Sequence, residues 1–269
     1  QVFEEFREFR FPDEPENALH VIEPFEIPKY WPRIVIGDWG YAAMTWVGFA
    51  AISPSGRLYL YRELHWTRTK IEEWAPVLSN FIEKDGNVKF IKFCQSAGQD
   101  RGQTHTIQEQ ISSALKREVL LTGNTAGSRI AGKMTIHEYL RWKKKVVLPE
   151  NDKPIFNEAF SQQLYRIKGE EAQRAYLKIF ETPPEETNIP KLQIFRTSPE
   201  GIPNQVVIDA IKACVYDDKK IEDIAEFKGD DPIDGLRYLV DAASEYVGIA
   251  QKEMAKVQKQ DYYAELFQN

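Results

Sequence analysis

Cysteine and histidine are scarce in this sequence, which has two cysteines and four histidines among 269 residues. Cys94 and Cys214 lie in apolar surroundings and form no metal-ligand spacing, so the simplest interpretation is a reduced, cytoplasmic compartment. The histidines show no ligand spacing either. Serine nucleophile elbows and paired-cysteine redox motifs are absent, which excludes the enzyme classes that depend on them.

Long apolar runs and an excess of positive charge are also missing. No apolar stretch approaches the ~18 residues needed to span a bilayer, and no signal-peptide pattern opens the chain, so we expect no membrane partner. The formal net charge of −6 argues mildly against general affinity for nucleic acid, because backbone binding needs clustered Lys and Arg. A local basic track remains open at three places, although a solvated helix face explains each one alone: residues 116–117, 141–145 and 219–220.

What is present predicts a globular α/β fold. Prolines at 24, 28 and 32 exclude a helix in the lead-in segment, which we expect to be extended. Two apolar, β-prone stretches then flank Gly37-Asp38-Trp39-Gly40, and residues 57–66 alternate as a half-buried strand does. Together they predict a three-strand antiparallel meander whose first strand carries Asp38.

Strands and helices alternate after the meander, which predicts a layered fold with a mixed sheet. Thr69 and Glu72 fit a capping box at the start of the first helix. Residues 176–198 suggest two short strands split by a Pro/Glu loop, and residues 250–269 a polar helical tail. Apolar periodicity predicts the other elements: helices at 69–84, near 103–115, at 134–145, at 202–214 and from about 230, and strands at 87–94 and 117–123.

Carboxylates stand at the start of the last helix and at the end of the first strand. Asp231 and Asp234 are three apart and share a helix face, so both can point at one site. Convergent carboxylates suit two-metal phosphodiester cleavage, in which ions ~3.5–4 Å apart activate water and stabilise the leaving oxygen. Blander interpretations exist, since Asp38 also suits a turn before Gly and residues 230–234 also suit an N-terminal capping run. Glu63 is expected to be a half-exposed sheet residue.

The order of these segments resembles the nuclease domain of phage terminase large subunits, over nearly all of residues 18–245. The resemblance rests on an IP-x-x-W-x-R lead, an apolar strand into G-D-W-G-Y, a strand ending in Y-R-E, and a late D-D-x-x-D-x-x-R-Y helix start. It implies a ribonuclease H-like mixed central sheet with helices on both faces, and an endonuclease that uses two Mg²⁺ or Mn²⁺ ions to trim viral DNA during packaging. The implied division is an extended arm at 1–33, a nuclease core at 34–247 and a helical tail at 248–269.

Carried over position by position, Asp38 matches the catalytic aspartate of the first strand. Asp231 and Asp234 match the late positions that complete the metal site, with Asp230 next door a further candidate ligand. Gln95 falls where the family has an aspartate. Because Gln offers only a neutral carbonyl oxygen to a cation, we expect the second ion to bind poorly and this copy to be inactive or weak, unless Asp100 substitutes.

The resemblance also implies partners that the sequence alone does not name. They are double-stranded DNA, an N-terminal packaging ATPase domain of the same parent chain, the portal protein and the small terminase subunit. Residue 1 is Gln rather than Met, so we expect a piece of a longer chain. The expected location is the host cytoplasm at the procapsid portal, and the protein is not expected to stay in the mature virion.

The DNA-contacting residues are expected to be basic. We expect Arg129 and Lys133, near the nuclease groove, and Lys143 and Lys144, in the basic run, to contact DNA phosphates. Residues 127–133 spell G-x-x-x-x-G-K, but Met134 stands where a phosphate loop needs Ser or Thr, so an ATP site is not expected. Two alternatives remain open: a stand-alone ribonuclease H-like nuclease or resolvase, and a non-catalytic docking or DNA-binding module of a packaging motor.

Overall fold

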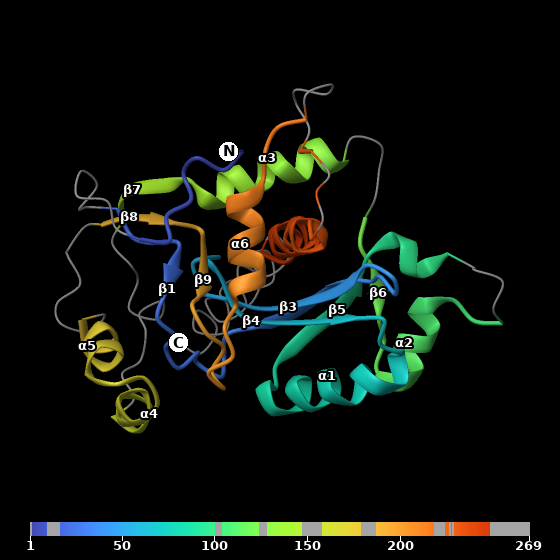
Figure 1. Ribbon diagram of the computed structural model, residues 1–269, viewed down its shortest axis with the longest axis horizontal. Coiled ribbons are helices and arrows are strands. Elements are labelled where there is room, and N and C mark those ends of the chain that lie inside the picture. Colours follow the sequence, from blue (N-terminus) through green and yellow to red (C-terminus); the bar gives the residue numbers. More distant parts are fainter. Residues whose placement is uncertain are drawn as a thin grey trace, which may run out of the picture.

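The computed structural model describes residues 2–9, 17–99, 104–123, 128–146, 158–178, 187–217, 224–225, 227 and 229–247. Among them, seven strands form one mixed sheet in the order β1-β9-β4-β3-β2-β5-β6 (Figure 1). The strands are β1 Val21–Ile22, β2 Arg33–Asp38, β3 Met44–Ile52, β4 Leu58–Thr67, β5 Val88–Phe93, β6 Leu120–Leu121 and β9 Leu192–Phe195. Strands β2, β3 and β4 pair antiparallel, which confirms the predicted meander. The pairs β2–β5, β5–β6, β4–β9 and β1–β9 are parallel.

Helices cover both faces of this sheet, as predicted (Figure 1). On one face lie α1 Ile71–Asp85, the short 3-10 helix η1 Gln95–Gly98 and α2 Ile107–Leu115. On the other lie α3 Ser128–Leu140, α6 Gln205–Ala213 and a helix at residues 231–247, named here the acidic helix. The helix pair α4 Glu158–Lys168 and α5 Glu170–Lys178 stands apart, beyond the β1 edge. None of the described helices meets the length and hydropathy that a membrane crossing requires.

Three local predictions are wrong. The basic run at 141–145, expected to end a helix, forms strand β7 Trp142–Val146, which pairs with β8 Thr187–Pro190. The strand expected near residue 176 is part of α5, because residues 170–178 have an amphipathic helical pattern with acidic residues in the first turn. The capping box expected at Thr69 does not form: α1 has Lys70 as its N-cap, without a side-chain cap.

The lead-in segment contributes to the core. Residues 2–9 and 17–33 contain no helix, as the prolines predict. Their side chains are nevertheless buried at Val2, Phe3, Phe6, Phe25 and Trp31, and β1 extends the sheet beside β9. The domain boundary predicted at residue 33 stays a prediction, and the predicted tail at 248–269 lies outside the described residues.

A buried arginine ties the two faces of the sheet together at β4. The guanidinium of Arg62 is fully buried and lies 4.3 Å from the ring centre of Phe81 on α1. It pairs with Asp85 at the end of α1 and with Glu200 in the segment before α6, the latter at 2.9 Å. Because breaking such a buried pair leaves an uncompensated charge, this network holds α1 and the segment leading into α6 in place.

Candidate active site

Asp38 is the last residue of β2. It lies at the end of the sheet where the carboxyl ends of the parallel strands β2 and β5 lie side by side. The backbone must pass close to β5 here, because a Cβ added at Gly37 would stand 2.3 Å from Phe93. The backbone N–H of Cys94, just past β5, donates to the carbonyl of Gly37 at 3.0 Å. The Cys94 thiol in turn donates a hydrogen bond to the Asp38 carboxyl. Burial raises the pKa of that thiol to about 11, so it stays a neutral donor.

The acidic helix brings further carboxylates to this edge. It begins at Asp231, and acidic residues are favoured in its first turn because the helix dipole presents partial positive charge there. Asp231 accepts a hydrogen bond from the backbone N–H of Met44, at the start of β3. Burial, and next the charge of Asp230, raise the pKa of Asp231. This contact anchors the first turn of the helix on the sheet, close to the end of β2.

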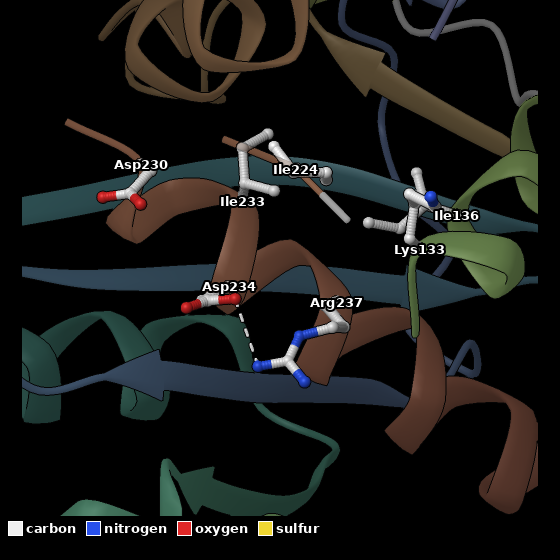
Figure 2. Close-up of a pocket in the computed structure, with 7 residues that line it drawn as sticks. All are labelled: Lys133, Ile136, Ile224, Asp230, Ile233, Asp234 and Arg237. Atoms are coloured by element: carbon white, nitrogen blue, oxygen red, sulfur yellow. Dashed lines mark ion pairs between the residues drawn. The ribbon is translucent and has the colours of Figure 1, made fainter. Parts of the chain in front are cut away.

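Asp38, Asp231 and Asp234 lie near enough to one another for their charges to interact. Burial raises the pKa of Asp38 to about 7; the Cys94 hydrogen bond lowers it, and the negative charges of Asp234 and Asp231 raise it further. Carboxylates influence one another in this way only when they are near neighbours. Three residues from segments far apart in the chain are therefore electrostatic neighbours, and their role as metal ligands stays a prediction. Asp230 lies at the helix start as well, and its carboxylate is separate from that of Asp234 (Figure 2).

A buried arginine borders the acidic group. Nη2 of Arg237 lies 3.1 Å from Oδ1 of Asp234, one helical turn earlier (Figure 2). Its side chain passes directly over Gly132 of α3, where an added Cβ would be 2.1 Å from the arginine Cγ. Sequence reasoning missed Arg237, although the i, i+3 spacing from Asp234 was a usable signal. Its positive charge lowers the pKa of Asp38.

The predicted basic residues are divided between two locations. Lys133 on α3 is buried and lines the same pocket as Asp230, Asp234 and Arg237 (Figure 2). Lys143 and Lys144 are exposed on β7, which follows the carboxyl end of α3. In Figure 1 this end of α3 lies on the far side from β6. Arg129 lies in the first turn of α3, and its side chain is outside the described residues. Because α3 already begins at Ser128, residues 128–131 do not form the loop that a phosphate-binding motif requires.

Gln95 and Glu63 are the remaining predicted residues that the structure describes, whereas Asp100 lies outside the described residues. Gln95 is exposed and opens η1 immediately after Cys94, at the same sheet edge as Asp38. Glu63, expected to be half-exposed, is 2% exposed, because its carboxylate accepts backbone hydrogen bonds from Val206 and Val207 at the start of α6.

The carboxylates suit a divalent metal ion in their chemistry. Oxygen donors are what Mg²⁺ and Mn²⁺ prefer, and a dication would offset both the burial and the like charges that raise the pKa of Asp38. In the part of the chain that the structure describes, no three His, Cys, Asp or Glu side chains are grouped closely enough to hold a metal ion. The donors therefore fit in type and charge, while their side chains are not gathered around one point.

Comparisons with known proteins bear on the fold. No protein-family model matches the sequence, and no curated protein matches it. Among solved structures, the large terminase of a thermophilic bacteriophage in complex with ATP-gamma-S is 16% identical, with a TM-score of 0.52 over 89% of this chain and 44% of that chain. The chain shares its fold with a phage large terminase. The resemblance read from the motifs is thus confirmed at the level of the fold, and the mixed sheet covered on both faces is the ribonuclease H-like arrangement expected.

Two further likenesses are weaker. The nuclease domain of the P22 large terminase is 12% identical, with a TM-score of 0.46 over 88% of this chain and 89% of that one. A mutant nuclease domain of the large terminase subunit of bacterial virus Sf6, solved with manganese and beta-thujaplicinol, is 13% identical, with a TM-score of 0.36 over 78% and 87%. The chain spans less than half of the thermophilic-phage terminase.

Proposed function

We propose that this chain is the nuclease part of a viral genome-packaging motor and cuts double-stranded DNA by hydrolysing phosphodiester bonds. The observation that carries the proposal is the electrostatic proximity of Asp38, at the end of β2, to Asp231 and Asp234, at the start of the acidic helix. A buried carboxylate whose pKa is raised to about 7 by desolvation and like charges is typical of a chemical site rather than of a structural ion pair. The shared fold agrees with this assignment.

In this proposal the acidic group holds Mg²⁺ or Mn²⁺, which when bound activates water and stabilises charge on the leaving oxygen. Asp38, Asp231 and Asp234 supply the oxygen ligands, and Asp230 is a further candidate ligand. Gln95 adds no negative charge, so the second of two ions is expected to bind weakly.

The basic residues have two parts in the proposal. Arg237 orients Asp234 through the 3.1 Å ion pair, and Lys133, beside it in the pocket, contacts a DNA phosphate. Arg129, Lys143 and Lys144 extend the basic track along the duplex.

The wider assembly is also a proposal. The thermophilic-phage terminase was solved with ATP-gamma-S and is more than twice as long as the part that this chain matches. We therefore place a packaging ATPase on the same parent chain, and the portal protein and small terminase subunit as partners. The site of action is the procapsid portal in the host cytoplasm.

Nicking of supercoiled plasmid DNA in Mn²⁺ tests the nuclease proposal. Asp38→Asn should abolish cleavage, because it removes the most buried ligand charge, whereas Gln95→Asp should increase cleavage by adding a charge for the second ion. Asp209→Asn, on the exposed side of α6, is the matched control and should cut like the starting protein. Equal cutting by the Asp38→Asn variant would show that the activity lies elsewhere.

Gln95 also favours a second candidate, a non-catalytic docking module that binds DNA or the portal. Isothermal titration with Mn²⁺ separates the two, because a docking module has no need of metal. If neither the starting protein nor Gln95→Asp cuts DNA or binds Mn²⁺, the docking function stands and the nuclease proposal is wrong.

A further inference from the structure

Trp46 occupies an unusual position between the sheet and the acidic helix. It is the cross-strand partner of Asp38 in the β2–β3 pair, so the two side chains leave the same face of the sheet. Its indole is fully buried and lies between two glycines. A Cβ added at Gly48, on the sheet side, would be 2.3 Å from the ring, and one added at Gly235, on the helix side, would be 2.2 Å from it.

Glu63 fixes the orientation of this ring. Nε1 of Trp46 donates to Oε2 of Glu63 at 2.8 Å, and Glu63 is the cross-strand partner of Gly48, so the indole runs along the strand above that glycine to reach it. The same carboxylate accepts the backbone N–H groups of Val206 and Val207 at 2.7 and 3.0 Å. If the ring rotated away, its buried N–H would lose its partner and the Glu63 carboxylate would lose one of its three donors.

We propose that Trp46 is a positioning residue whose ring thickness sets the gap between Asp38 on the sheet and Asp231 and Asp234 on the acidic helix. Both aspartates of the helix precede Gly235 by no more than four residues, so they move with the point at which the helix rests on the ring. Glu63 is the group that holds the spacer in its orientation. The inference rests on the proposed function and deepens it, because the gap determines how tightly a divalent cation is held.

Ordinary core packing does not produce this arrangement. Trp31 is equally buried and stacks on Tyr59 with ring centres 5.5 Å apart. A tryptophan that only fills volume tolerates neighbours with side chains, whereas Trp46 has a glycine on each side at contact distances that exclude any side chain. The backbone of β3 at Gly48 and that of the acidic helix at Gly235 therefore both lie directly against the indole ring, so the thickness of the ring sets the distance between them.

The test uses Trp46→Phe and Gly235→Ala, with Trp31→Phe as the matched control. Crystal structures of the variants measure the position of the acidic helix relative to β2 and β3, and Mn²⁺ titration measures the affinity of the site. We expect the helix to move and Mn²⁺ binding to weaken by about 10- to 100-fold, the range seen when outer partners of metal ligands are lost. Trp31→Phe should change neither quantity. Unchanged helix position and affinity in Trp46→Phe would overturn the proposal.

A rescue experiment separates spacing from general destabilisation. The methyl group of Gly235→Ala lifts the helix off the indole, so replacing the indole with a smaller side chain in Gly235→Ala/Trp46→Leu should return the helix towards the sheet and recover Mn²⁺ affinity. Effects that simply add would contradict a spacer role. Should Gly235→Ala not fold, Trp46→Phe alone decides. If the starting protein binds no Mn²⁺, the proposed function fails, and the helix displacement in the crystal structures still decides the positioning role.

Discussion

Two carboxylates in this protein, half-buried Asp38 and buried Glu63, show how partners distinguish a structural acid from a chemical one. Burial raises the pKa of both Asp38 and Glu63 to about 7. Glu63 is surrounded by hydrogen-bond donors, from Trp46 and from the first turn of α6, which lower its pKa in part. Asp38 has one thiol donor and two neighbouring negative charges. Both carboxylates are desolvated, but their partners differ. The donors around Glu63 hold the start of α6 in place, whereas the negative charges beside Asp38 favour the binding of a cation.

The raised pKa of Asp38 predicts a pH-dependent stability. In the unfolded chain the group ionises near 3.8, and in the folded protein near 7, so its contribution to stability is fully present below pH 3.8 and falls as pH rises through 7. Asp38→Asn removes this loss. In EDTA it should gain little stability at about pH 4 and at most about 4 kcal/mol at about pH 8, at about 1.4 kcal/mol per pKa unit. Urea unfolding across this range measures the difference.

Asp209→Asn serves as the control for this experiment. Asp209 is exposed; burial raises its pKa, but hydrogen bonds from Gln205 and Lys212 and the charge of Lys212 together outweigh burial and lower it. Its replacement should therefore give no gain at high pH. A stability difference for Asp38→Asn that stays constant with pH would contradict the assigned titration.

At the scale of single elements, the same capping sequence can precede two helices and form a cap at only one of them. Both α1 and α2 are preceded by a Thr with Glu three residues later. Only Thr106 forms the capping box, with its side chain accepting from the N–H of Glu109 and the Glu109 carboxylate accepting from the N–H of Thr106. Thr69 instead donates to the carbonyl of Thr67. One signal in the sequence thus has two outcomes in the folded protein.

This difference predicts unequal effects of two identical substitutions. Thr106→Ala removes a working N-cap and should lower the free energy of unfolding by about 1 kcal/mol. Thr69→Ala removes an exposed hydrogen bond outside the helix and should change it by much less. Thermal unfolding of the two variants under the same conditions measures this. Equal destabilisation would show that Thr69 caps α1 in solution.

The packing of α3 on the acidic helix predicts that the effect of Gly132→Ala on stability changes sign when Arg237 is removed. Alanine is favoured over glycine inside a helix by about 1 kcal/mol, but at Gly132 the added methyl would meet the buried side chain of Arg237. Overpacking of this kind costs about 1–3 kcal/mol, so Gly132→Ala should be destabilising. In an Arg237→Ala background the space is free, and the same substitution should stabilise. Urea unfolding of the four proteins gives the double-mutant cycle, and a Gly132→Ala effect of the same sign in both backgrounds would contradict this close contact.

At the scale of the whole molecule, the candidate site forms only when distant parts of the chain meet. β2 lies near the beginning of the described chain and the acidic helix at its end, and both must settle on the same sheet before the carboxylates converge. Because the unfolded chain has no such site, any cation that binds there stabilises the fold by mass action.

Divalent cations should therefore raise the melting temperature. At a Mn²⁺ concentration of about 100 times Kd, the expected gain is about 2.7 kcal/mol. The gain should be smaller below about pH 7, where protons compete for Asp38, and should be lost in Asp38→Asn. Differential scanning calorimetry with and without EDTA measures it. A rise of equal size in the Asp38→Asn variant would place the cation elsewhere.

The sequence by itself determined the features that depend on short-range order. Alternation and turn residues predicted the meander and the place of Asp38, and helical periodicity predicted the buried side of the acidic helix, with Ile233, Leu236 and Leu239 all buried. The shared side of Asp231 and Asp234 followed from helix geometry. Only the tertiary structure decided the burial of Glu63, the clamped ring of Trp46 and the approach of Arg237 to Gly132. These contacts join residues that are far apart in the sequence. Local periodicity shows which side of an element is apolar, but it does not show which other element will cover that side.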